Sequence, residues 1–71
     1  MKKSIIIEGM SCMHCVNHVK NALEEVTGVG EINVDLQGKN AVVELRQDIT
    51  DQILKEAIEE AGYDVVEIKV I

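Results

Sequence analysis

The sequence predicts an α+β fold in which two helices cover one face of a four-stranded antiparallel sheet. Three observations support this prediction. The 71 residues allow one domain, over residues 1–71. Apolar residues recur at helical spacing in two segments and alternate in four others, in the order βαββαβ. Because right-handed crossovers place both helices on the same face, this order predicts the ferredoxin-like split βαβ arrangement.

The first predicted strand covers residues 3–8, with Ile5 and Ile7 on one face. Met10 falls on the opposite parity and would point away from that face if the strand continued. Gly9 lies between, and glycine permits the bulge or turn that would re-aim Met10 inward. We therefore expect the strand to end at Gly9 and Met10 to point toward the core.

A helix is predicted over residues 15–26. Its apolar stripe has helical spacing and consists of Cys15, Val16, Val19, Ala22, Leu23 and Val26. Gly28 follows the last of these, and glycine is the residue that most readily takes the left-handed conformation at a helix end. We expect the helix to end at Thr27-Gly28.

A β-hairpin is predicted next, with strands over residues 29–36 and 41–45 and a polar turn over residues 37–40. Alternation predicts which side chains of the hairpin point inward: Ile32, Val34, Leu36, Ala41, Val43 and Leu45. The whole predicted core is aliphatic, because the chain has no Phe or Trp and a single Tyr.

The second helix has a clear start at Thr50, an N-cap residue followed by Asp51 at the positive end of the helix dipole. Ile49 and Leu54 are spaced as a hydrophobic staple. Gly62 ends the helix, and a last strand runs over residues 63–70. The predicted helical stripe is Ile53, Leu54, Ala57, Ile58 and Ala61, and the last strand places on one parity Val66, Ile68 and Val70.

The charge of the chain excludes some function classes. A net charge of −6 argues against binding to a phosphate backbone, which needs a basic face, and suits a basic protein partner instead. The apolar run near the N-terminus is only Ile5-Ile6-Ile7, too short for a secretory signal or for membrane insertion. We expect a cytoplasmic location, where thiols stay reduced.

The segment between the first strand and the first helix contains both cysteines, Cys12 and Cys15. At this spacing one loop or helical turn can bring the two sulfurs together, and thiolates are soft ligands that select Cu(I), Zn(II) and similar ions. Cys15 would lie in the first helical turn, where the helix dipole lowers a thiol pKa. The placement predicts metal binding or redox chemistry.

Other uses of a CxxC pair fit less well. A c-type haem site needs His directly after the second cysteine, where Val16 stands. An iron–sulfur cluster usually needs four cysteines, and a closed zinc site needs four ligands. A thiol–disulfide redox protein is the serious competitor, although such proteins are usually longer and the chain has no proline. No catalytic triad, phosphate loop or carboxylate pair is assembled, so we expect no enzyme.

Residues 9–15, Gly-Met-Ser-Cys-Met-His-Cys, resemble the MxCxxC signature of the heavy-metal-associated domain family, and the resemblance extends over the whole chain. The family comprises small copper chaperones and the N-terminal metal-binding domains of copper-transporting P-type ATPases. The resemblance implies that Cys12 and Cys15 bind Cu(I) as a near-linear dithiolate. It implies supporting roles for Met10, which packs the loop, for Tyr63, which shields the metal, and for His14, which lies exposed before the second cysteine.

The resemblance further implies a cytosolic copper chaperone that passes Cu(I) by ligand exchange to a metal-binding domain of a copper-transporting P-type ATPase. An N-terminal domain of such an ATPase is the alternative within the family. Ser11 stands where zinc and cadmium exporters tend to have Asp, which favours copper. His18 and Met13 are interpreted as surface residues. We expect a monomeric apo-protein that dimerises weakly when copper bridges two molecules.

Overall fold

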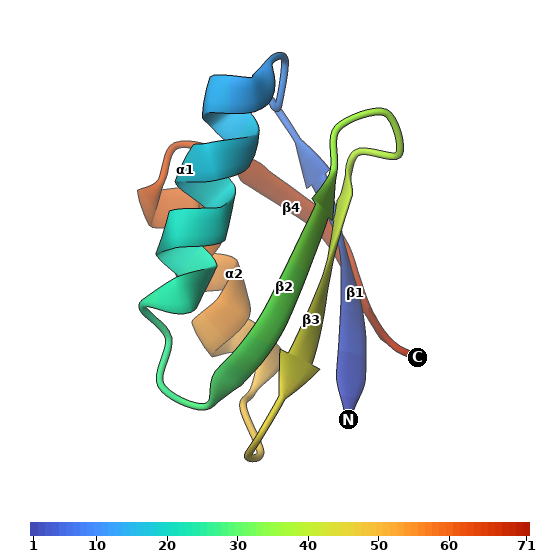
Figure 1. Ribbon diagram of the computed structural model, residues 1–71, viewed down its shortest axis with the longest axis vertical. Coiled ribbons are helices and arrows are strands. Elements are labelled where there is room, and N and C mark those ends of the chain that lie inside the picture. The colour runs from blue at the N-terminus through green and yellow to red at the C-terminus, as the bar shows by residue number, and fades with distance from the viewer.

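The computed structural model describes residues 1–71 and shows the expected order of elements (Figure 1). The sheet has the strand order β2-β3-β1-β4, and every neighbouring pair is antiparallel. Both helices lie on the same side of this sheet, so the ferredoxin-like prediction is confirmed. The elements are β1 Lys2–Glu8, α1 Met13–Glu24, β2 Val29–Asp35, β3 Asn40–Leu45, α2 Asp51–Glu60 and β4 Asp64–Val70.

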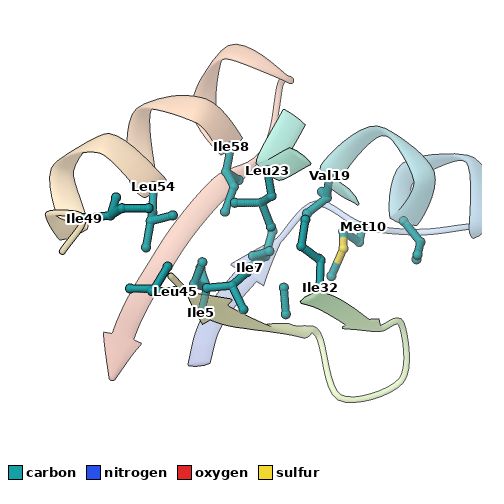
Figure 2. Packing of buried hydrophobic residues seen from close by; sticks show 13 residues of the cluster. Ile5, Ile7, Met10, Val19, Leu23, Ile32, Leu45, Ile49, Leu54 and Ile58 are labelled. Atoms are coloured by element: carbon teal, nitrogen blue, oxygen red, sulfur yellow. The ribbon is translucent and has the colours of Figure 1, made fainter. Parts of the chain in front are cut away.

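The core lies between the helices and the sheet and contains no aromatic side chain among its fully buried members (Figure 2). Each strand and helix contributes the face that its apolar spacing predicts, with the exceptions described below. The cluster consists of Ile5, Ile7, Met10, Val16, Val19, Leu23, Ile32, Ala41, Val43, Leu45, Ile49, Leu54 and Ile58. Burial of these aliphatic side chains is the main source of stability in so small a domain.

The first helix begins and ends two residues earlier than the periodicity predicted. It spans Met13–Glu24 because Cys12 already has the extended backbone of an N-cap, and its C-cap is Glu25. Gly28 has a φ of +97°, as expected for a left-handed glycine, but it lies in the following loop. The loop directs the chain into β2 and does not cap the helix.

The hairpin turn is also shifted by one residue. The turn occupies residues 36–39, and Asn40 already belongs to β3. Lys39 takes the left-handed conformation with φ +54°, whereas Gly38, the residue with the lowest cost for it, does not.

The ends of α2 agree with prediction and have a further consequence. The Thr50 side chain accepts a hydrogen bond from the backbone N–H of Ile53 at 3.4 Å, which caps the start. At the other end Gly62, with φ +97°, donates to the carbonyl of Glu59, and Tyr63 donates to that of Ile58. These two bonds form a Schellman motif. The motif fixes the backbone position of Tyr63.

One residue of the predicted α2 stripe does not reach the core. Ile53 is 46% exposed, whereas its neighbour Leu54 is fully buried. The stripe predicted from spacing was therefore too wide by one position, because α2 packs through a narrower face against the sheet.

The single parity predicted for Val66, Ile68 and Val70 holds only for the last two, which lie opposite Ile5 and Lys3. Val66 is 58% exposed, while Val65 and Ile68 pack against the core. The alternation of this strand is interrupted between Val66 and Ile68, so a single period-2 pattern cannot describe it.

A β-bulge is the physical reason. The register of β1 against β4 shifts between Ile6 and Ile7, so that Ile7 lies opposite Val65 and Val66 is left unpaired. Because of this extra residue, the side chains of β4 that precede Val66 point to the opposite faces from those that strict alternation predicts. Val65 and, two residues earlier, Tyr63 thereby come to the helix-covered side of the sheet.

Lys3 is the one buried charged residue. Its Nζ donates to the Ile49 carbonyl at 3.1 Å and to Asp51 Oδ1 at 2.6 Å, which ties β1 to the start of α2.

Neither helix of the protein has the length and apolar character required to cross a bilayer.

Candidate functional site

The β1–α1 loop and the first turn of α1, which together contain both cysteines, lie at one end of the sandwich (Figure 1). Gly9 starts the loop with φ +99°, a conformation that costs other residues free energy. This turn sends the Met10 side chain into the core, where it is 7% exposed (Figure 2). The loop is thus anchored on both sides, by Met10 and by the first buried turn of α1.

Cys12 occupies the N-cap position of α1 but makes no side-chain capping bond. Its carbonyl accepts from the N–H groups of Cys15 and Val16, at 3.0 and 3.2 Å, so the backbone closes the first turn. A Ser, Thr, Asp or Asn at this position would normally direct its side chain at the helix N–H groups. The sulfur of Cys12 instead remains exposed and free for another partner.

The two sulfurs lie 3.7 Å apart, and both cysteines are free thiols. Cys15 is half-buried against the core, whereas Cys12 faces solvent. No third His, Cys, Asp or Glu side chain converges with them to make a metal-binding group of three or more. One molecule therefore offers a soft ion two sulfur ligands and an open side.

Hydrogen bonding lowers the pKa of Cys15 from 9.0 to about 6. The largest cause is the backbone N–H of Ser11, followed by the Tyr63 hydroxyl, and smaller contributions come from the side chains of Cys12 and Ser11. Partial burial opposes them. Because all of these donors favour the charged form, Cys15 is mostly a thiolate at neutral pH, which is the form that binds metal.

Tyr63 connects Cys15 to His18, to which the sequence analysis assigned no role in the site. Its hydroxyl lies 3.3 Å from Nδ1 of His18, and its own pKa is raised, chiefly by the hydrogen bond to Cys15. A hydroxyl has one proton, so when Tyr63 donates to the thiolate it must accept from Nδ1–H of His18. His18 is exposed, as the sequence predicted, and in this position it supports the hydroxyl that supports Cys15.

The structure brings some of the predicted site residues together and leaves others apart. Tyr63 comes within reach of the loop, and a Cβ added at Gly9 would lie 3.4 Å from its ring. Ser11 Oγ lies 3.9 Å from Cys15 Sγ. His14 and Met13 are exposed on the first turn of α1, and His14 belongs to no group of three or more His, Cys, Asp or Glu side chains that could hold a metal ion.

Comparison with known proteins gives a family. The sequence model described as heavy-metal-associated domain matches residues 4–64. A protein named copper chaperone CopZ from Staphylococcus epidermidis is 46% identical over 65 residues, which cover 90% of this chain and 96% of the relative.

Solved structures agree. A structure described as CopZ metallochaperone superimposes with a TM-score of 0.85 at 36% identity, covering 93% of this chain and 100% of the other. A copper binding domain from HMA7, a P-type ATPase, superimposes with a TM-score of 0.86 at 35% identity, covering 99% and 96%. The same fold therefore occurs both in a free chaperone and in a domain of a larger transporter.

Proposed function

The chain belongs to the heavy-metal-associated domain family, and on that premise we propose that it is a cytoplasmic copper chaperone. In this proposal Cys12 and Cys15 bind one Cu(I) as thiolates, and the protein passes the ion to a metal-binding domain of a copper-transporting P-type ATPase. It acts as a carrier rather than as an enzyme. The family match, the name of the 46% identical relative and the copper-binding ATPase domain among the similar structures support this assignment.

One observation supports it above all: two sulfurs 3.7 Å apart at an exposed end of the molecule, with no third ligand converging on them. Structural zinc sites are closed by four ligands, whereas a site with two soft ligands suits Cu(I). The open side admits a cysteine of a partner. That thiolate adds to the ion before one of the first two leaves, so the ion is never released into water.

The spacing of the sulfurs bears on how the ion would sit. With a metal–sulfur bond of about 2.3 Å, sulfurs 3.7 Å apart subtend an angle of about 107° at the ion. A linear arrangement needs them about 4.6 Å apart, or roughly 0.9 Å further than here. Cys12 is the exposed member and the helix-capping bonds do not involve its side chain, so its rotation supplies this movement.

We assign supporting roles to three residues. Met10 is only 7% exposed and fixes the loop from the core side. Tyr63 donates to Cys15 and covers one side of the loop. His14 remains exposed beside the cysteines and serves as an additional ligand only when two copper-loaded molecules meet, in the weak bridged dimer that we propose for the loaded protein.

Transfer between two proteins tests the proposal. The copper-loaded protein is mixed with an apo metal-binding domain of a copper ATPase, and copper in each is measured after separation by ion exchange. We expect copper to reach equilibrium between the two proteins within the mixing time. We expect no transfer of zinc from zinc-loaded protein to the acceptor domain. Cys12→Ser is the matched control, because it removes one sulfur from an exposed position. If the acceptor domain were loaded no faster by the copper-loaded protein than by free Cu(I) alone, the chaperone role would be contradicted.

A thiol–disulfide redox function is the second candidate, because Cys15 combines a lowered pKa with a partner sulfur 3.7 Å away. Reduction of insulin by the apo-protein separates the two functions. We expect a rate at background level. A rate that depends on both cysteines and exceeds background many-fold would favour the redox function.

A further inference from the structure

A groove with a volume of about 600 Å³ runs between α1 and α2, on the side of the helices away from the sheet. Small side chains make it possible: Ala22 on α1 faces Ala57 and Ala61 on α2, so the helix surfaces leave space between them. Ile53 adds an apolar surface at its wall and is 46% exposed. Together with Ala22, Ala57 and Ala61 it gives the groove an apolar floor.

The charges around the groove have one sign. Glu25, Glu56 and Glu60 line it, and no lysine or arginine does. These glutamates come from the C-cap of α1 and from α2, and like charges that line one groove suit a cationic ligand. The chain as a whole has a net charge of −6, which strengthens the attraction for a basic partner at long range.

We propose that this interhelical groove binds a short basic segment of a partner protein, in which lysine or arginine residues flank an aliphatic side chain. The aliphatic side chain packs between the three alanines and Ile53, and the cationic side chains pair with the glutamates. The lining extends along α1 from His18 to its C-cap Glu25, a rise of about 10 Å, and continues to Val26 just beyond. A rise of about 10 Å matches about three extended residues or two helical turns.

One end of the groove reaches the metal loop. His18 lines the groove and also lies 3.3 Å from the Tyr63 hydroxyl, which hydrogen-bonds to Cys15. A segment docked in the groove therefore lies beside His18, and only Tyr63 stands between His18 and Cys15. The surface is small, so the complex is weak and short-lived. A carrier that must release its acceptor after each transfer needs such a contact.

This inference rests on the proposed function only in naming the copper acceptor as the protein that contains the segment. The docking itself is tested on the apo-protein, without copper. The probe is a capped six-residue peptide of alternating lysine and leucine, added to ¹⁵N-labelled protein and followed by amide chemical shifts. Two matched peptides replace leucine by serine or lysine by glutamate.

We expect the lysine–leucine peptide to shift the amides of Ala22, Ile53 and Ala57 and to leave the open face of the sheet unchanged. The serine peptide should bind at least threefold more weakly and the glutamate peptide should not shift these amides. Glu56→Gln with Glu60→Gln should weaken binding by about two- to thirtyfold, the range for two exposed ion pairs. Half-molar salt should weaken it as well.

The controls use exposed positions outside the groove. Ile53→Ser should abolish the shifts, whereas Val70→Ser, which removes a more exposed valine from β4, should not. Glu31→Gln on β2 is the matched control for charge. Three results would each overturn the proposal. The first is equal weakening of binding by the control and groove variants, and the second is equal binding of the glutamate peptide. The third is concentration-dependent shifts without peptide, which would indicate a second copy of the protein in the groove. Copper binding by Ile53→Ser, measured separately, should equal that of the parent protein. A parent protein that bound the peptide but no copper would refute the proposed function and leave the groove intact.

Discussion

Replacing Tyr63 with phenylalanine is expected to raise the pKa of Cys15. The Tyr63 hydroxyl is the second-largest cause of the lowered pKa, after the backbone N–H of Ser11, and phenylalanine removes this donor while it keeps the ring. The ring packs against the core, so the fold should be preserved. The change therefore tests whether a side chain 48 positions away in the sequence controls the charge of the cysteine.

The magnitude follows from the pKa of about 6. At pH 7 a thiol with this pKa is roughly nine-tenths thiolate, whereas a thiol at 9.0 is about 1% thiolate. A thiolate of low pKa is also a poorer nucleophile, by about 16- to 32-fold for a difference of three units. The two effects leave Cys15 about three- to sixfold more reactive toward a disulfide reagent at pH 7 than an ordinary thiol. The pH of half-maximal reactivity follows the pKa and moves from 9.0 to about 6, whereas the reaction rate at pH 7 changes only about three- to sixfold.

The assay is the pH profile of thiol modification between pH 4 and 10, in a Cys12→Ser background so that only Cys15 reacts. Because the Cys12 side chain makes a smaller contribution to the lowered pKa, we expect a midpoint at or slightly above about 6 in this background and a clearly higher midpoint when Tyr63→Phe is added. Met13→Leu, an exposed position in the first turn that does not contribute to the pKa, serves as control. An unchanged midpoint in Tyr63→Phe would refute the assigned hydrogen bond.

The same shift predicts the sign of a pH effect on stability. The pKa of Cys15 is lower in the folded protein than its ordinary value of 9.0, so the folded state binds the proton less well. The stabilisation is fully present above pH 9.0, declines as the pH falls and is lost below about 6.

Three further predictions concern stability, each measured by urea denaturation. Gly9→Ala should lower the free energy of unfolding by about 1–3 kcal/mol, because alanine is strained at the positive φ of this position, and it should also weaken copper retention. Gly28→Ala is the control: Gly28 has a similar φ but lies remote from the loop, so copper retention should be unchanged. Lys3→Ala should cost about 2 kcal/mol, because a buried stem and two hydrogen bonds are lost, and Lys3→Met should recover most of it; equal losses would refute the role of the stem. Asp64 lies directly opposite Glu8 with the same charge, so Asp64→Lys should stabilise by roughly 0.5 kcal/mol at low salt, and no gain would show that the two carboxylates do not interact.

Most of the fold could be predicted because the two periods of the sequence are clean in five of the six elements. The residues that were placed wrongly have identifiable causes. The bulge at Val66 reverses the facing of the start of β4, and a bulge has no period that a sequence pattern could reveal. Ile53 fits the helical stripe by spacing, but only the tertiary packing shows that the stripe is narrower. Lys3 has core parity, yet its burial depends on Asp51, 48 residues later.

The site was predictable only in part. The CxxC spacing and the helix that follows predict that Cys12 and Cys15 lie together at a helix start, and the structure shows this. The contact between His18 and Tyr63 could not be predicted, because it joins residues 45 positions apart. That contact requires both the Schellman motif after α2 and the β4 bulge, which together turn Tyr63 toward the loop.

The most direct test of the two-thiolate site is Cu(I) binding in competition with a chromogenic Cu(I) chelator, on the parent protein, Cys12→Ser and Cys15→Ser, with circular dichroism to verify that the apo forms are folded. The account predicts one Cu(I) per chain in the parent, none retained by either serine variant, and folded apo spectra for all three. Retention of one equivalent by either variant would contradict the assignment of both sulfurs as ligands.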